Sequence, residues 1–195
     1  MRSRRTVHKV GLVIEGEIVK KSLIIFLMMS LALFGYEPES VEVGFTAFKT
    51  PAKIGVNGSF NTVEVTGKKS AGSVEEMLTG LGVTIETKSV NSGHEGRDRL
   101  LVSDFFLVQF IHAIQARIVT VKADSLVVEI TMNNKTVSVP MVYKKEENKV
   151  MAKGYIDLGD FDMLPSLKGI NTACYDLHEG KTWQDVEVGF LLHFK

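Results

Sequence analysis

Residues 83–106, VTIETKSVNSGHEGRDRLLVSDFF, contain the pattern that decides the fold. Apolar and polar side chains alternate with a period of two at its start, as they do in a strand with one buried face. A polar, glycine-containing patch with Arg97 and Asp98 follows, and the stretch ends on the aromatic pair Phe105 and Phe106. This order predicts a strand, then a long polar turn, then an aromatic segment.

The period of two recurs along the chain and predicts about eight strands. They cover residues 41–48, 55–65, 83–90, 113–124, 125–132, 136–144, 149–158 and 185–194. In the first strand, Val41, Val43, Phe45 and Ala47 share one face. Many short strands joined by polar turns favour an antiparallel sandwich or barrel, and closure into a barrel removes the exposed edges of an open sheet.

Short helices are expected between the strands. Residues 73–76, SVEE, form a capping box that opens a helix through Leu81. Residues 103–111 predict a second helix, and residues 163–172 predict a third short turn. The predicted class is an all-β, eight-stranded antiparallel lipocalin-like β-barrel with one to three short helices, which forms a single domain over residues 36–195.

The first 35 residues have a different character. Lys20 and Lys21 precede an apolar run over residues 22–35, which is shorter than the about 20 residues needed to span a bilayer. A basic flank, a short apolar centre and the small residue Gly35 predict a cleaved signal peptide and a periplasmic protein, with a retained anchor as the alternative. Residues 1–19 are interpreted as a non-native extension, and no stable membrane insertion is expected after removal of the signal.

Charge excludes one class of partner. The whole chain has 23 basic and 23 acidic residues, and without residues 1–35 it keeps 17 basic and 21 acidic ones, a net charge of −4. A mildly acidic domain without a polybasic patch is not expected to bind nucleic acid or to grip anionic headgroups. The lone Cys174 excludes an internal disulfide and is interpreted as a small buried apolar residue.

Motifs for catalysis are missing from the sequence. His94, His112, His178 and His193 have no second ligand at a spacing that would hold zinc. The sequence also lacks a nucleophile elbow, a Walker loop and a dinucleotide fingerprint. We therefore expect no enzyme, no catalytic residue, no metal and no cofactor.

Two further segments accompany residues 83–106. GVNGSF stands at residues 55–60 and GYIDLGDFDM at residues 154–163. In chain order, residues 55–60, 83–106 and 154–163 resemble corresponding segments of the YceI-like family. Its members are secreted β-barrel proteins that enclose a long apolar lipid, typically a polyisoprenoid. The resemblance covers about residues 41–194. The chain departs from the family at Leu100, where many members have a His, so a polar contact shared at this position is in doubt.

The resemblance implies a lipid tunnel lined by aromatic and flexible side chains. The expected ligand contacts are Phe45, Phe60, Ile85, Phe105, Phe106, Phe110, Met141, Ile156, Met163 and Arg97. Any single phenylalanine or methionine equally fits a filled core. Arg97 and Asp98 fit two roles, fixing the turn before Phe105, which is favoured, or placing Arg97 against a ligand headgroup at the barrel mouth.

The predicted function is that of a periplasmic carrier that sequesters one long-chain lipid in the barrel. A polyisoprenoid or isoprenoid quinone is expected, with a fatty acid or fatty amide as alternatives. The competing hypothesis is a dry barrel that binds a protein partner at its surface. Pairing of two chains into a homodimer stays open.

Overall fold

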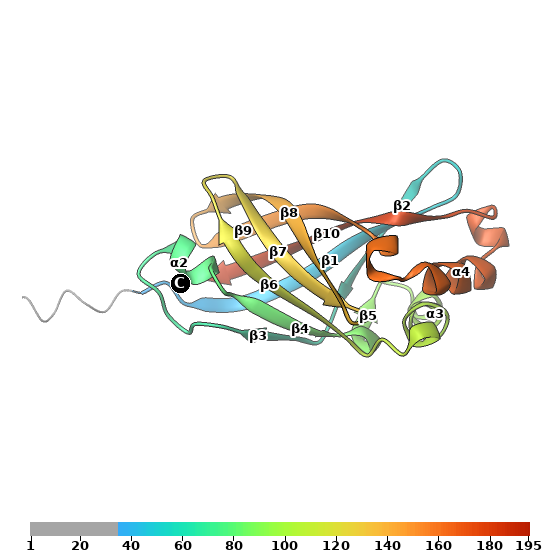
Figure 1. Cartoon of the computed structure of the whole chain (residues 1–195), viewed down its shortest axis with the longest axis horizontal. Helices are drawn as coiled ribbons and strands as arrows, with labels where there is room; N and C mark the ends of the chain where they lie inside the picture. The colour runs from blue at the N-terminus through green and yellow to red at the C-terminus, as the bar shows by residue number, and fades with distance from the viewer. Residues whose placement is uncertain (1–34) are drawn as a thin grey trace, which may run out of the picture. The chain divides into compact units, whose positions relative to one another are not determined.

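The computed structural model describes residues 35–195 as an antiparallel sheet that wraps around a common interior, with short helices at both ends (Figure 1). The predicted extension and signal peptide lie outside the described residues, apart from Gly35. Within residues 35–195, none of the helices combines the length and the apolar character needed to cross a membrane.

Ten strand segments follow one another across the sheet in the order β3-β4-β6-β7-β8-β9-β10-β1-β2-β5. The strands are β1 Pro38–Lys49, β2 Ile54–Phe60, β3 Val63–Thr66, β4 Gly82–Glu86, β5 Val90–Asn91, β6 Ala113–Val121, β7 Ser125–Met132, β8 Lys135–Glu146, β9 Lys149–Asp157 and β10 Thr182–Phe194. The helical segments are α2 Val74–Leu78, η1 Thr87–Ser89, α3 Glu95–Leu101, η2 Val102–Phe106, η3 Leu107–Gln109, η4 Leu158–Phe161, α4 Leu164–Ala173 and η5 Asp176–His178.

The two ends of this strand order meet, because they belong to segments that are continuous in the chain. β2 leads into β3 across residues 61–62, and β4 leads into β5 across η1. β3 pairs with β4, with Val63 opposite Ile85, and β2 pairs with β5, with Phe60 opposite Val90. Counted as long strands with one interruption each, β2–β3 and β4–β5 complete a ring of eight antiparallel strands in chain order. The predicted eight-stranded barrel is confirmed.

The interruption of the third predicted strand has its own hydrogen bonds. The Ser89 hydroxyl accepts from the Thr62 amide at 3.0 Å and donates to the Glu86 carbonyl at 2.7 Å. The buried Thr87 hydroxyl donates to the Ile111 carbonyl at 2.6 Å. These side chains therefore satisfy backbone groups at a bend, although their alternation in the sequence is that of an unbroken strand.

The predicted inner face of β1 is correct. Val41, Val43, Phe45 and Ala47 all face cavities inside the barrel. Phe45 is paired across the strands with Gly58, and a side chain at Gly58 would overlap the Phe45 ring. The missing side chain thus leaves room for an inward-pointing phenylalanine at this position.

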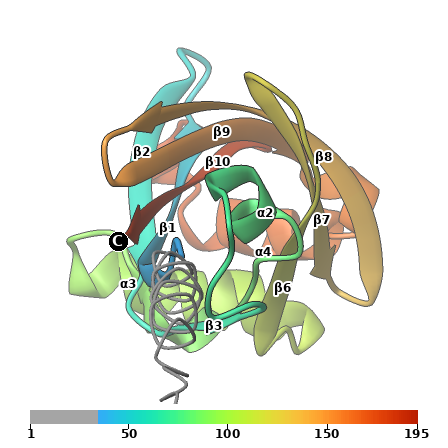
Figure 2. The same ribbon diagram turned by 90° about the vertical axis from the view of Figure 1, so that its left-hand side faces the viewer.

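Helix α2 closes one end of the barrel, and Figure 2 shows it inside the ring of strands. The predicted capping box is present, since the Ser73 hydroxyl accepts from the Glu76 amide at 3.0 Å. Val74, Met77 and Leu78 are at most 1% exposed. This end is filled by side chains.

The opposite end carries the helical cap, which we define as residues 95–109 and 164–178 (Figure 1). The predicted helix over residues 103–111 is present up to Gln109, but its start was wrong, because the chain becomes helical at Glu95 rather than near Ser103. The His94 ring accepts from the Arg97 amide through Nδ1 at 3.2 Å and so caps the helix. In the sequence, Gly93 and Gly96 flank His94 and Glu95 and favour a turn. In the structure, the cap at His94 instead allows a helix to begin at Glu95. The third helix, α4, is a full ten-residue helix.

Candidate functional site

The barrel interior contains two adjoining cavities. The larger has a volume of about 480 Å³ and lies beneath the helical cap, and the smaller, of about 110 Å³, lies towards α2. Both are lined by Phe45, Phe60, Ile114, Met132, Ile156 and Val188. The larger volume falls in the range of about 300–1,000 Å³ that is typical of small-molecule sites.

The inner surface of the cap comes partly from α3 and η2. Leu100, Leu101, Phe105 and Phe106 all line the larger cavity. Segment η2 continues α3 as a single π-helical turn, in which the Leu107 amide donates to the Val102 carbonyl five residues earlier. The Phe105 and Phe106 rings meet edge to face, with centroids 5.0 Å apart. At Leu100, the departure from the family pattern supplies an apolar wall.

Helix α4 completes the cap. Leu167, Ile170 and Cys174 line the larger cavity from this helix and its C-terminal end. Gly169 lets α4 approach η2, because a side chain there would overlap the Asp104 carbonyl oxygen. Burial raises the pKa of the Cys174 thiol, and the nearby Asp104 charge raises it further. The thiol is therefore a weakly nucleophilic part of an apolar wall.

The larger cavity reaches the surface beside η5. Leu177 lines it and is nevertheless 71% exposed. Other residues of this region come from the β1–β2 hairpin, the start of α3 and the start of β10. We define the mouth as Phe48, Lys49, Val56, His94, Arg97, Leu177, His178, Thr182 and Trp183.

Arg97 and Asp98 both bind Ser92. The Arg97 guanidinium donates from Nε to the Ser92 hydroxyl at 2.8 Å and from Nη2 to the Ser92 carbonyl at 2.7 Å. Asp98 accepts from the amide and the hydroxyl of Ser92. These contacts agree with the favoured role of fixing the segment before Phe105. Arg97 also lines the cavity, so both roles that the sequence left open are compatible with its position.

A hydrogen-bonded chain orients His178. Asn171 donates through Nδ2 to the Gly180 carbonyl at 3.3 Å, which turns its Oδ1 towards Thr182. The Thr182 hydroxyl donates to this oxygen at 2.8 Å and lies 2.7 Å from His178 Nδ1. Since the hydroxyl proton is used, His178 Nδ1 is the donor and Nε2 is left as an acceptor in the neutral ring. Burial lowers the pKa of His178, and the Lys49 charge lowers it further.

Trp183, the chain's single tryptophan, is fixed at the mouth. Its indole N–H donates to the Thr50 carbonyl at 2.8 Å. Lys53 and Lys181 place their ammonium groups 5.1 Å and 4.6 Å from the centre of the ring. A ring held in this way is suited to report on a ligand that enters the cavity.

Most of the predicted contact residues surround the two cavities. Phe45, Phe60, Ile85, Phe105, Phe106, Met141, Ile156 and Arg97 are all lining residues. Whether they bind a ligand stays a prediction.

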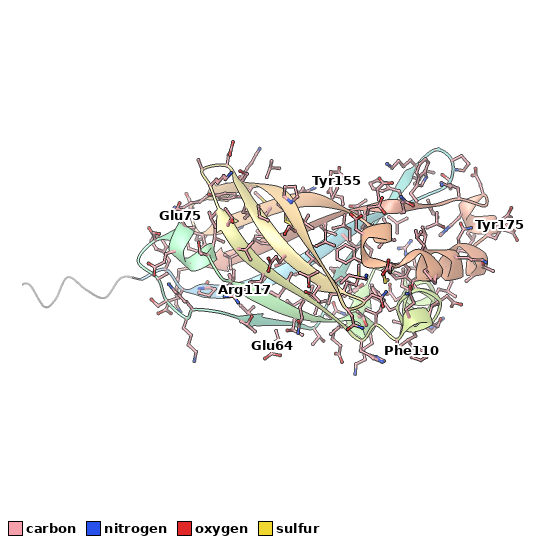
Figure 3. All side chains as sticks on the ribbon, viewed as in Figure 1. Glu64, Glu75, Phe110, Arg117, Tyr155 and Tyr175 are labelled. Atoms are coloured by element: carbon pink, nitrogen blue, oxygen red, sulfur yellow. The ribbon has the colours of Figure 1, made fainter. Side chains whose placement is uncertain are left out.

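Two further predicted contact residues, Phe110 and Met163, line neither cavity. Phe110 is 79% exposed. Its backbone is left-handed (φ 56°) directly after η3, and Figure 3 shows its side chain at the outer edge of the molecule. Met163 is fully buried, but in the packed core next to η4 rather than at a cavity wall.

Several lining residues were missed by sequence reasoning. Ile114 and Val188 occupy inward positions of predicted strands, so the period of two contained the signal that would have found them. Leu167 and Ile170 are three apart on α4, which is a helical spacing. His178 and Trp183 had no such signal, because their place at the mouth depends on tertiary structure.

The described residues 35–195 contain no group of three or more His, Cys, Asp or Glu side chains arranged to hold a metal ion. The cavity walls instead consist mainly of aliphatic and aromatic carbon. Such a surface can enclose an apolar chain by excluding water from it.

Fold and site together define a small antiparallel barrel with an apolar interior that opens beneath a helical cap. The family model described as "YceI-like domain" matches residues 34–194, and the chain belongs to this family. A search of curated protein sequences found no match.

Solved structures share the fold at low sequence identity. A polyisoprenoid binding domain from Saccharophagus degradans has a TM-score of 0.58 at 10% identity, over 82% of this chain and 97% of that chain. Burkholderia cenocepacia BcnA has a TM-score of 0.51 at 16% identity, over 78% and 94% of the two chains. A mutant YCEI protein from Campylobacter jejuni with a monobromobimane guest has a TM-score of 0.50 at 18% identity, over 72% and 85%.

Proposed function

We propose that the protein binds one long-chain apolar lipid in the larger cavity and acts as a periplasmic carrier or store for it. The observation that carries this proposal is the apolar cavity of about 480 Å³, which is closed towards α2 and reaches the surface at Leu177. The structural neighbour described as a polyisoprenoid binding domain supports an isoprenoid chain as the ligand class.

Burial of the chain itself would supply the affinity. Each methylene removed from water contributes about 0.8 kcal/mol, which is close to a fourfold change in Kd. Such a site discriminates weakly between chains of similar length, as a carrier or store would. We propose binding without catalysis, because below the mouth the walls that surround the chain are aliphatic and aromatic carbon.

The competing proposal, a dry barrel that binds a protein partner, requires large side chains to fill the interior. Two adjoining cavities favour the lipid instead.

Fluorescence of Trp183 tests the proposal. Delipidated protein is titrated with fatty acids of increasing chain length, delivered from cyclodextrin, and the shift of the tryptophan emission is followed. We expect saturable binding at one site per chain, with a Kd that falls about fourfold for each added methylene until the cavity is full. Unchanged emission, together with a protein that retains no chain after gel filtration, would contradict the proposed function.

A further inference from the structure

We propose that the mouth of the larger cavity is an oxyanion site in which Lys49 and Arg97 bind a carboxylate or phosphate headgroup. The inference rests on the proposed function and extends it, because it makes the ligand an anionic single-chain amphiphile rather than a neutral lipid.

The first argument comes from the signs of the charges. Lys49 and Arg97 are the lysine and the arginine that line the larger cavity, and no carboxylate of residues 35–195 lines it with them. Neither side chain makes an ion pair within this part of the protein. Charges beside an apolar volume are costly unless paired, so an anion at this place would relieve the cost.

The geometry of Arg97 is the second argument. Two of its five N–H groups bind Ser92, which fixes the plane of the guanidinium. Its remaining N–H groups, including both on Nη1, are available to a ligand. Asp98 is the nearest acidic residue in the sequence, and its carboxylate is occupied by Ser92. A fixed guanidinium with free donors suits the two-point binding of a carboxylate or phosphate.

Lys49 is the last residue of β1, half-buried at the start of the hairpin. It lines the larger cavity together with His178 and Cys174. Its charge adds to the effect of burial in lowering the pKa of His178, and it opposes the effect of burial, which raises the pKa of Cys174. Lys49 and Arg97 thus both line the cavity at its mouth.

The rim adds to the positive potential. Lys53 and Lys181 stack over Trp183, and Lys53 is also paired with Asp185. The average charge of the domain led us to expect no grip on anionic headgroups. The proposal departs from that expectation, because the potential at a site depends on nearby charges and on the low-dielectric walls around them rather than on the net charge.

His178 defines the competing possibility. In its neutral form, it offers Nε2 as an acceptor, since Nδ1 donates to Thr182. An uncharged alcohol could donate to this nitrogen. An alcohol would leave the charges of Lys49 and Arg97 without a counter-ion, and charge-assisted bonds are roughly twice as strong as neutral ones.

Matched ligands separate these possibilities. Binding to delipidated protein is measured for hexadecanoic acid against its methyl ester, and for farnesyl phosphate against farnesol. Two charge-assisted contacts predict that each anion binds at least about tenfold more tightly than its neutral partner. The first pair tests a carboxylate headgroup and the second a phosphate headgroup. Tighter binding of the anion in either pair supports the oxyanion site.

Variants locate the effect. Lys49→Met is expected to weaken binding of the anions about tenfold and to leave the methyl ester unchanged. Lys68→Met, which removes a lysine paired with Glu76 and remote from the cavity lining, is the matched control and should change neither. Arg97→Lys retains one charge but not the fork, and is expected to weaken the anions less than Arg97→Gln does. Circular dichroism confirms that each variant is folded.

The orientation of the chain is tested with bromine, which quenches tryptophan at contact distance. 2-Bromohexadecanoic acid should quench Trp183 more than 16-bromohexadecanoic acid does, because the headgroup lies at the mouth. The reverse order, or equal affinity for anions and neutral partners, would overturn the oxyanion site and leave the proposed lipid function intact. Absence of binding by every chain would overturn both.

Discussion

The two ends of the barrel are built from the same alternating strands, yet one is solid and the other hollow. At one end, α2 inserts Val74, Met77 and Leu78 between the strands, and these side chains are at most 1% exposed. At the other end, α3, η2 and α4 lie across the opening and leave a cavity of about 480 Å³ beneath them. The strands therefore define a bore, and the helices decide whether it is filled.

The difference follows from how each helix meets the barrel. Helix α2 has only five residues and lies within the ring of strands (Figure 2). Its apolar side chains occupy the interior at this end of the barrel. The cap helices pack on one another, with α4 held against η2 at Gly169, and so form a roof. Helices that pack on each other need not fill the space below them.

The largest effect is expected on lipid retention when a charge is placed in the cavity at the hollow end. Phe105→Glu places a charge on the cavity wall, and we expect lipid retention to fall by at least about a hundredfold, because an unpaired buried charge costs several kcal/mol. Phe110→Glu is the matched control, since Phe110 is exposed, and it should retain lipid normally. Co-purified lipid is measured by mass spectrometry after extraction. Equal retention by two folded variants would remove Phe105 from the binding wall.

Stability should respond mainly to the solid end. Met77→Ala removes a fully buried side chain and is expected to lower the free energy of unfolding by about 2–5 kcal/mol. Leu177→Ala at the mouth, where the side chain is 71% exposed, should change it by less than about 0.5 kcal/mol. Urea unfolding of delipidated protein measures both. Similar losses for the two variants would show that the ends do not differ as the structure describes.

A methyl group added at Gly169 should separate α4 from η2 in the helical cap. In Gly169→Ala, the new side chain would overlap the Asp104 carbonyl, so α4 must move away from η2. We expect a loss of about 1–3 kcal/mol in stability and faster dissociation of bound lipid. Gly72→Ala, where the methyl group meets only the Glu76 carboxylate at 3.4 Å, should dissociate lipid at the normal rate. Stopped-flow transfer to vesicles gives both rates, and equal rates would contradict the role of the roof.

The smallest effect concerns the cap of α2. Ser73→Ala removes the hydroxyl that accepts from the Glu76 amide, and we expect a loss of about 1 kcal/mol in the free energy of unfolding. Lipid affinity should stay the same, because Ser73 does not line either cavity. A change in affinity with unchanged stability would reverse the assignment of the two ends.

Sequence alone predicted the barrel wall well. The period of two located all eight strands and the inner face of β1, because side-chain alternation is a direct consequence of strand geometry. It did not show that Thr87 and Ser89 bind backbone at a bend, nor that His94 caps a helix at Glu95. Both outcomes depend on which hydrogen bond each side chain makes in the folded protein, because a Thr, Ser or His side chain can bond to several nearby backbone groups.

The cavity was harder to predict than the wall. Phe110 and Met163 have the same apolar character as the lining residues, and only the left-handed turn at Phe110 and the packing next to η4 separate them from the cavity. The mouth draws Lys49, Arg97 and His178 from distant parts of the chain. A sequence pattern cannot bring such residues together, and the net charge of the domain gives no indication that two basic side chains, Lys49 and Arg97, line one mouth.

Native mass spectrometry tests most directly whether the hollow end holds a lipid. The protein is isolated from its own cells without detergent and weighed before and after organic extraction, and the extract is identified. We predict one adduct of lipid mass per chain, which Phe105→Glu loses and Phe110→Glu keeps. A bare chain mass, together with failure of the extracted protein to take up isoprenoid or fatty chains, would contradict the proposed binding function.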